Sequence, residues 1–414
     1  MKNGWQIKQL GELCKTIQDG AHRSPQVQFT TPGVGRYLYI TSKNIRTNYL
    51  DLANVSYVDA EFHDDIYPRC KPEVGDVLLT KDGANTGNVT LNTIDEPFSL
   101  LSSVCLIKTE PSLLVPAFLC YFIQSPEGLA SITGEMTGAA IKRIILRTIK
   151  LATIPLPPLA EQRRIVGILD EAFEGLANAK ANAEQNLQNA RALFESHLQA
   201  VFTQRGDGWD RMTLETLLER GWIEDHMDGN HGGDYPRKEE FISEGVPYIS
   251  ANCLDGERVD MSRAKFLSPS RAALLRKGFA KDNDVLFAHN ATVGPVTILH
   301  TDEEKVILGT SLTYYRCNRA HILPEYLAHY MRSFGFKTQY LQVMRQSTRN
   351  QVPITKQREF FHVVPPLDEQ KAIIGQLDGL LENGQRLESL YQRKLAALDE
   401  LKKSLLHRAF SGQL

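Results

Sequence analysis

The sequence Pro-Pro-Leu-Ala-Glu-Gln at residues 157–162 is repeated as Pro-Pro-Leu-Asp-Glu-Gln at residues 365–370. The two copies are separated by about half the length of the chain, which has 414 residues. Each copy predicts the start of a helix, because proline is tolerated in a first helical turn but not deeper in a helix. The glutamate in that turn suits the positive end of the helix dipole. We therefore expect two long helices, one in the middle of the chain and one at its end.

Apolar residues continue from each copy at steps of three and four, which over several heptads is typical of a coiled coil. A helix of about 40 residues would be roughly 60 Å long. An Ala-rich seam over 172–192 and a Leu-rich seam over 377–405 should pack on each other. The apolar pattern of the first helix runs through Ile165, Leu169, Ala172, Leu176, Ala179 and Ala183, slips near Leu187 and resumes through Ala190, Phe194, Leu198 and Val201. The pattern of the second runs through Leu377, Leu380, Gly384, Leu387, Tyr391, Leu395, Leu398, Leu401 and Leu405.

The segments before the two helices also repeat each other. A β-type run after Asp76 matches one after Asp284, and a helix opened by Pro116 matches one opened by Pro324, all at the spacing that separates the two Pro-Pro pairs. We therefore predict an α+β fold, with two pseudo-two-fold related α/β domains separated by two long antiparallel coiled-coil helices. The expected segments are a first domain over 1–155, a spacer helix over 156–205, a second domain over 206–364 and a second spacer helix over 365–414.

Composition is that of an ordinary globular protein with a formal net charge of −2. The first residues lack an apolar signal core, and no apolar run is long enough to span a membrane, so a cytoplasmic protein is expected. The six cysteines form no CxxC pair and no zinc-type spacing, so no metal site is expected. The glycine-rich loops match neither a P-loop nor a dinucleotide-binding pattern.

Local charge gives the clearest indication of function. Residues 136–160 and 326–358 contain no acidic residue but several Lys and Arg, and both runs end close to a Pro-Pro pair. Lys and Arg bind phosphates, while Arg, Asn and Gln can read base edges through paired hydrogen bonds. The matching loops 137–143 and 347–353 in these runs therefore suit DNA.

Around Pro-Leu-Pro-Pro-Leu-Ala-Glu-Gln (155–162) and Val-Pro-Pro-Leu-Asp-Glu-Gln (364–370), the sequence resembles the specificity (S) subunit of type I restriction–modification systems. The resemblance covers the whole chain and extends to Gly-Asp-Val-Leu-Leu at 75–79 and to the loop 138–144. The second domain departs from the family pattern, with Asn283 where Gly75 stands and a different loop over 349–353.

The resemblance implies a non-catalytic DNA sequence-specificity subunit with two target-recognition domains, each reading one half of a bipartite double-stranded DNA target. The coiled coil would set the spacing between the halves and dock two methyltransferase (M) subunits. This chain would bind no cofactor itself. S-adenosylmethionine would belong to the methyltransferase subunits, and ATP and Mg to the restriction (R) subunits, in a complex that defends against foreign DNA. The sequence agrees, since it lacks the [ND]PP[YFW] motif of adenine methyltransferases.

Polar and basic loop residues are the candidates for contacts with bases and phosphates. In the first domain they are Lys43, Asn44, Lys81, Asn85, Thr86, Lys142 and Arg143. In the second they are Asn252, His289, Asn290, Thr292, Arg345, Thr348, Arg349 and Asn350.

Two alternatives remain open from the sequence. One is a coiled-coil scaffold with protein-binding globular ends and no DNA role, although such a scaffold does not need two acid-free basic runs. The other is an enzyme with an unrecognised site, which ranks last because Cys and His are scattered without a spacing that predicts a catalytic set.

Overall fold

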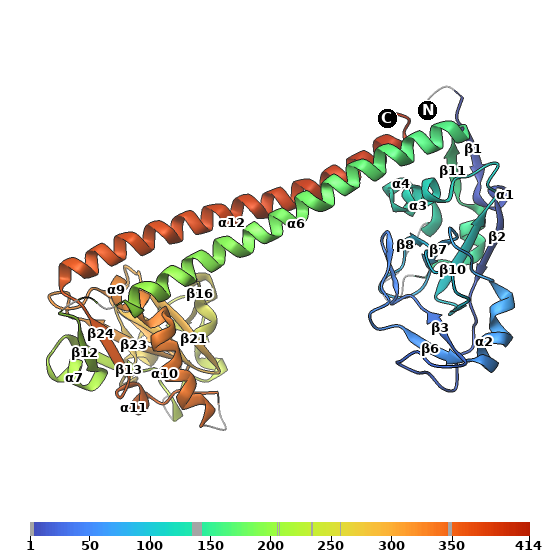
Figure 1. Ribbon diagram of the computed structural model, residues 1–414. Coiled ribbons are helices and arrows are strands. Elements are labelled where there is room, and N and C mark those ends of the chain that lie inside the picture. The colour runs from blue at the N-terminus through green and yellow to red at the C-terminus, as the bar shows by residue number, and fades with distance from the viewer. Residues whose placement is uncertain are drawn as a thin grey trace. The chain divides into compact units, whose positions relative to one another are not determined.

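The computed structural model describes residues 4–134, 143–204, 206, 208–232, 235–256, 258–346 and 350–414. The chain divides into two compact units, the first formed by Met1–Glu184 with Arg393–Leu414 and the second by Gln185–Gln392. Helices and sheets are mixed in both units (Figure 1), as the predicted α+β class requires. The four-segment division predicted from the sequence remains a prediction. Among the described residues, no helix combines the length and apolar character that a membrane crossing needs.

The first unit is built on a four-stranded antiparallel sheet in the order β2-β10-β7-β8, beside a three-stranded sheet in the order β6-β3-β9. The β-type run predicted after Asp76 is β7, which lies with β10 at the centre of the four-stranded sheet. The elements are β1 (Gln6–Gln9), α1 (Leu10–Leu13), β2 (Cys14–Asp19), β3 (Arg36–Ile40), β4 (Ile45–Arg46), β5 (Tyr49–Leu50), β6 (Ser56–Asp59), α2 (Ala60–Ile66), a 3-10 turn (Tyr67–Arg69), β7 (Val77–Thr80), β8 (Val89–Leu91), β9 (Ser99–Leu100), β10 (Val104–Thr109), α3 (Pro116–Gln124), α4 (Pro126–Thr133), α5 (Leu146–Leu151) and β11 (Thr153–Leu156).

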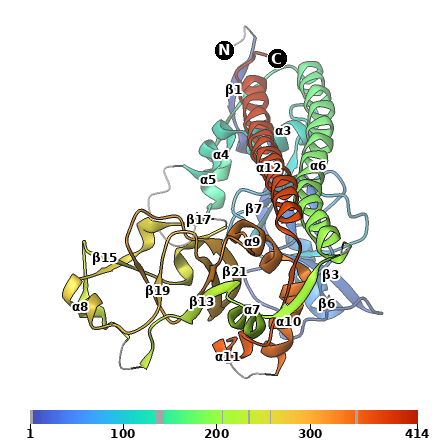
Figure 2. The same cartoon turned by 90° about the vertical axis from the view of Figure 1, so that its left-hand side faces the viewer.

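The second unit repeats this plan (Figure 2), with a sheet in the equivalent order β13-β23-β20-β21 and a five-stranded sheet in the order β14-β18-β15-β22-β19. Helix α9 packs on β21 and β20. The elements are β12 (Asp210–Thr213), α7 (Leu214–Glu219), β13 (Ile223–Asp228), β14 (Phe241–Ile242), β15 (Val246–Ile249), β16 (Leu254–Asp255), β17 (Arg258–Val259), β18 (Lys265–Leu267), α8 (Pro269–Ala273), β19 (Phe279–Ala280), β20 (Val285–Asn290), β21 (Thr292–Ile298), β22 (Val306–Leu308), β23 (Leu312–Cys317), α9 (Pro324–Arg332), α10 (Phe334–Arg345), α11 (Ile354–Gln357) and β24 (Phe361–Val364), with 3-10 turns at Lys238–Glu240, Ala251–Cys253 and Met261–Arg263.

The two long helices predicted from the Pro-Pro repeat are α6 (Leu159–Thr203, 45 residues) and α12 (Leu367–Phe410, 44 residues). They run antiparallel within each unit. In the first unit Lys180 pairs with Asp399 at 3.0 Å. In the second unit Arg191 pairs with Glu388 at 3.0 Å. The prediction of two long helices that pack together is confirmed.

The seam of α12 differs from the predicted one at two positions. Leu387 and Leu401 are 38% and 48% exposed and lie on the outer face of the helix. The partly buried positions beside them are Glu388 and Lys402, one step along. Positions 381, 388, 395 and 402 recur every seven residues, as do 377, 384, 391, 398 and 405, so the helix keeps a heptad seam and the prediction placed Leu387 and Leu401 one residue out of register.

Each long helix is fastened to its unit by the glutamine of the repeated motif. Gln162 is fully buried, accepts from the Val115 amide at 2.8 Å, and donates to the carbonyls of Leu113 and Pro157, each at 2.9 Å. Gln370, also fully buried, makes the same three bonds in the second copy, with Leu323, His321 and Pro365. A Pro-Pro pair followed by glutamine is thus a helix start whose side chain also satisfies three buried backbone groups.

Positive-φ positions explain a departure of the second domain from the first. Asn283 has φ +67° where Gly75 has φ +88°, and Ala291 has φ +64° where Gly83 has φ +97°. Asparagine tolerates the left-handed region, whereas alanine does not adopt it readily. The substitution of glycine by Asn283 therefore keeps the backbone conformation, and Ala291 carries strain.

We expect Ala291→Gly to raise the free energy of unfolding of the second unit by about 1 kcal/mol, because glycine adopts this φ without a Cβ clash. Gly83→Ala should lower the stability of the first unit by a similar amount. That cost comes from the backbone conformation alone, since a Cβ at Gly83 would meet only Ser42 Oγ, at 3.9 Å. Urea unfolding of the full chain, with hydrogen exchange to assign the unit, measures both changes. The account would be contradicted if Ala291→Gly did not stabilise the second unit, or if Gly83→Ala did not destabilise the first.

Candidate functional site

A second repeated motif, which the sequence analysis missed, lies at the end of the first strand of each four-stranded sheet, β2 in the first unit and β13 in the second. Asp-Gly-Ala-His at residues 19–22 matches Asp-Gly-Asn-His at residues 228–231. Both aspartates are buried, at 3% and 8% exposure, whereas the two histidine side chains are 55% and 60% exposed. Each unit therefore presents an imidazole beside a buried carboxylate.

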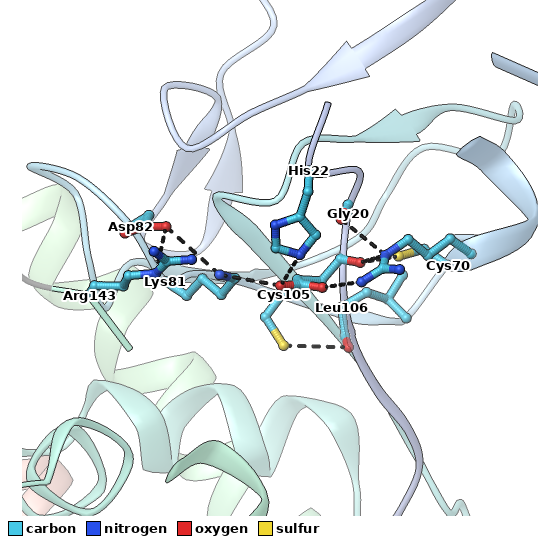
Figure 3. Close-up of polar contacts among 10 residues, drawn as sticks. Gly20, His22, Cys70, Lys81, Asp82, Cys105, Leu106 and Arg143 are labelled. Atoms are coloured by element: carbon cyan, nitrogen blue, oxygen red, sulfur yellow. Dashed lines mark hydrogen bonds and ion pairs between the residues drawn. The ribbon is translucent and has the colours of Figure 1, made fainter. Parts of the chain in front are cut away.

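Three basic side chains surround the carboxylate of Asp19. Arg69 Nη2 donates to Oδ1 at 2.7 Å, and His22 Nε2 and Lys81 Nζ lie 3.1 and 3.3 Å from Oδ2. Figure 3 shows His22, Lys81, Asp82 and Arg143 joined in one chain of such contacts. Burial alone would raise the pKa of Asp19, but the Arg69 hydrogen bond and the charges of Lys81 and His22 outweigh it and lower that pKa. Asp19 thus stays ionised and fixes its basic neighbours.

The second unit builds the same centre with different partners. Asp228 accepts a short hydrogen bond from Lys277, which stands where the first unit has Arg69, and His231 Nε2 lies 3.5 Å from the second carboxylate oxygen. Lys277 also donates to His231 Nε2 at 2.8 Å. A cavity of about 710 Å³ opens here, lined among others by Asp228, His231, Lys277 and Arg358.

The glycine of each motif is required by close backbone packing. A Cβ at Gly20 would lie 2.1 Å from the Leu100 carbonyl oxygen, and one at Gly229 would lie 2.0 Å from that of Gly309. These distances leave no room for any side chain. Close backbone packing therefore explains the glycine of the repeated Asp-Gly-x-His motif, and a search of the sequence for short repeats could have found this motif.

The ends of the central strands β7 and β20 are built alike. Ile144 N donates to Lys81 O at 2.8 Å, and Val352 N donates to His289 O at 2.8 Å, with donor and acceptor at equivalent positions of the two units. Isolated β-bridges next to these bonds pair Asp82 with Arg143 and Asn290 with Gln351. One backbone arrangement therefore holds two different sets of side chains.

The structure places the candidates of the first unit in one region but gives them different exposures. Arg143 is exposed and its Nε lies 3.4 Å from Asp82 Oδ2. Lys43 is also exposed and donates to Ser56 Oγ at 3.3 Å. Asn85 donates to Ser42 O at 3.3 Å. Thr86 donates to Gly83 O at 2.6 Å. Asn44 and Lys81 are each 2% exposed, and Lys142 lies outside the described residues.

The buried candidates of the first unit support the surface residues. Asn44 accepts from the Thr41 amide at 3.0 Å and donates to Asp51 O at 3.0 Å, so it closes a turn. Lys81 lies between Asp19 and Asp82. The burial of Lys81 follows from its position, because it continues β7, which is flanked by β10 and β8. Direct contact of these two side chains with DNA stays a prediction.

In the second unit, Asn290, Thr292 and Asn350 lie together at the end of β20. Asn350 Nδ2 donates to Ala291 O, and Ala291 N donates to Asn350 O at 3.0 Å. His289 is 2% exposed, its Nδ1 lies 2.9 Å from Val352 O, and burial lowers its pKa. The remaining candidates are exposed Asn252, in a turn, and Arg345, at the end of α10, while Thr348 and Arg349 lie outside the described residues.

The described parts of the two acid-free runs contain helices and the strand β11, and some of their basic side chains are paired. Arg147 and Lys150 lie on α5, where Lys150 is exposed. Arg332 donates to Val296 O at 3.0 Å, and Arg358 lies 3.5 Å from Glu215. An acidic residue from elsewhere in the chain therefore reaches the second run, which its sequence did not indicate.

A family model and several known proteins match the sequence of this chain. Residues 2–187 match the family model of the type I restriction modification DNA specificity domain. The chain is 22% identical to the EcoBI type I restriction enzyme specificity subunit of Escherichia coli, over 82% of this chain and 73% of that protein. It is 24% identical to the EcoKI specificity subunit of Escherichia coli K12, over 100% of this chain and 90% of that protein.

Two solved structures share the fold. One, described as the structural basis of complex assembly and conformational transition of the type I R-M system, has a TM-score of 0.80 at 19% identity and covers 100% of this chain and 99% of that one. The HsdS subunit from Thermoanaerobacter tengcongensis has a TM-score of 0.61 at 18% identity, with coverages of 100% and 98%.

The first unit therefore contains a match to a DNA specificity domain, and the second unit repeats the strand order of its four-stranded sheet. Residues 2–187 thus match the type I restriction modification DNA specificity domain, and the chain is similar over most of its length to specificity subunits of type I restriction enzymes.

Proposed function

We propose that each globular unit reads one half of a split double-stranded DNA target, and that α6 and α12 set the spacing between the halves. The observation that carries this proposal is the repeated strand end, where one backbone arrangement holds Lys81, Asp82 and Arg143 in one unit and His289, Asn290 and Gln351 in the other. A common framework with two sets of side chains suits two different half-sites, because base edges are read by side chains.

We further propose that the chain carries no catalytic step and recruits subunits that do. Two methyltransferase subunits, which would hold S-adenosylmethionine, dock on the outer faces of α6 and α12 and on the Pro-Pro hinges. Restriction subunits, which would use ATP and Mg, complete the complex. This division of labour is supported by the relatives, which are named as specificity subunits of type I restriction enzymes.

The direct test is a map of methylated adenines in a methylation-free host that expresses this chain with its neighbouring methyltransferase. We expect a split motif of two short blocks with a fixed gap. If no new methylation arises although the two proteins are soluble and co-purify, the proposal fails in favour of a scaffold without a DNA role.

The spacer can be tested by lengthening both helices together. A heptad inserted into α6 and another into α12 at facing positions add about 10.5 Å and rotate the helix faces by only about 20°. The gap in the methylated motif should grow by about 3 base pairs, since successive base pairs rise about 3.4 Å. An insertion in α6 alone is the control and should disrupt pairing. If the variant with both insertions still methylates the original spacing, the two helices do not set the distance between the half-sites.

A further inference from the structure

The side chains that differ between the two strand ends stand at equivalent positions. The first strand-end pair is Asp82 and Arg143, and the second strand-end pair is Asn290 and Gln351; each pair is joined by a β-bridge. The neighbouring backbone bonds, from Ile144 to Lys81 and from Val352 to His289, have the same length of 2.8 Å. The two pairs therefore occupy one frame with different chemistry.

Both pairs are accessible and weakly held. The side chains of Asp82 and Arg143 are 26% and 56% exposed, and the ion pair between them measures 3.4 Å. Asn290 and Gln351 are partly exposed, and Asn290 Nδ2 reaches Thr310 O only at 3.5 Å. An exposed ion pair is easily opened by a competing partner, so these groups can exchange their present contacts for others.

Their chemistry matches different base pairs. Arginine donates to O6 and N7 of guanine and aspartate accepts from N4 of cytosine, whereas asparagine and glutamine each bond both N6 and N7 of adenine. In addition, the first pair stands beside Lys81, which is held between Asp19 and Asp82, while the second stands beside His289, whose pKa is lowered by burial. Charged side chains therefore surround Asp82 and Arg143, whereas the neighbour of Asn290 and Gln351 is a histidine whose protonation is disfavoured by burial.

We propose that the two strand-end pairs are specificity-determining residues, with Asp82 and Arg143 selecting a G·C pair in one half-site and Asn290 and Gln351 selecting an A·T pair in the other. The backbone arrangement that the two units share would lie against the sugar–phosphate backbone, which is common to both half-sites. The strand-end pairs would contact the bases, which differ between the half-sites. This inference rests on the proposed function.

The experiment exchanges the pairs and reads the selected sequence. The purified full chain is used to select duplexes from a random DNA library. Asp82→Asn with Arg143→Gln should change one position of one block from G·C to A·T, with a change in preference of about 10-fold or more. Asn290→Asp with Gln351→Arg should make the opposite change, in the other block only.

Two controls separate reading from folding and charge. Arg143→Lys keeps the charge but loses the planar fork, so it should bind DNA and lose the guanine preference. Lys15→Gln with Glu110→Gln makes the same charge change at a surface ion pair of 3.6 Å in the first unit and should leave the motif unchanged. Unfolding curves of each variant confirm that it folds.

The outcomes separate this inference from the proposed function. A wild-type chain that selects two blocks, with exchange variants that select the same blocks or bind weakly without a new preference, overturns the role of the pairs and leaves the function standing. A wild-type chain that selects no motif overturns both.

Discussion

Replacing Gln162 by leucine should lower the free energy of unfolding of the first unit by about 3 kcal/mol or more. Leucine of similar size fills the site but leaves the Val115 amide and the carbonyls of Leu113 and Pro157 without their partner. Each buried polar group left unsatisfied costs about 1–3 kcal/mol. Hydrogen exchange in the full chain should show the loss first at residues 113–115 and at the start of α6.

Two variants serve as controls for this experiment. Arg163→Ala changes an exposed residue in the same helical turn and should have little effect. Gln370→Leu should produce the same loss in the second unit and leave the first intact. A loss below about 1 kcal/mol for both glutamines would mean that the repeated motif does not fasten the helices.

The second unit should lose stability in acid more than the first. Burial lowers the pKa of His226 to about 4 and that of His362 to about 3. An unfolded histidine takes up its proton near pH 6.5. Between these values the unfolded chain binds more protons, so the free energy of unfolding is at its full value above pH 6.5 and falls as pH falls toward 4. At pH 5 the loss should be about 2 kcal/mol for each histidine.

The first unit supplies the matched control, because Ile154 stands where the second unit has His362, at the spacing of the Pro-Pro repeat. Neither ring nitrogen of His362 has a hydrogen-bond partner within the part of the chain that the structure describes, so His362→Ile removes a titrating group without breaking a bond. This variant should retain about 2 kcal/mol more stability at pH 5 than the wild type, relative to pH 7.5. Hydrogen exchange at the two pH values measures it, and an unchanged acid response would show that His362 does not titrate on unfolding.

The elements governed by local rules were predictable from the sequence. The Pro-Pro pairs predicted the starts of α6 and α12, and the β-type runs after Asp76 and Asp284 predicted β7 and β20. The cluster around Asp19 was not predicted, because Arg69 and Lys81 stand far from Asp19 in the sequence and meet it only through tertiary structure. A search for short repeats would have found the motif itself.

The candidate site was predictable as a region but not residue by residue. Loop composition pointed to Lys81 and His289, yet both are buried because they follow or belong to strands that have a neighbour on each side. Conversely, Asp82 and Gln351 drew no attention, since only the β-bridges place them beside Arg143 and Asn290. Which side chains meet is decided by strand pairing, and a pattern of residue types does not contain that pairing.

The division of the chain into units sets an order of folding during synthesis. The first unit includes Arg393–Leu414, and its core contains Phe410, whose ring lies 5.1 Å from that of Phe118 and 5.3 Å from that of Phe122. The second unit needs nothing after Gln392. All residues of the second unit are therefore synthesised before the last residues of the first unit, and we expect the core of the first unit to close last although its sheet is synthesised first.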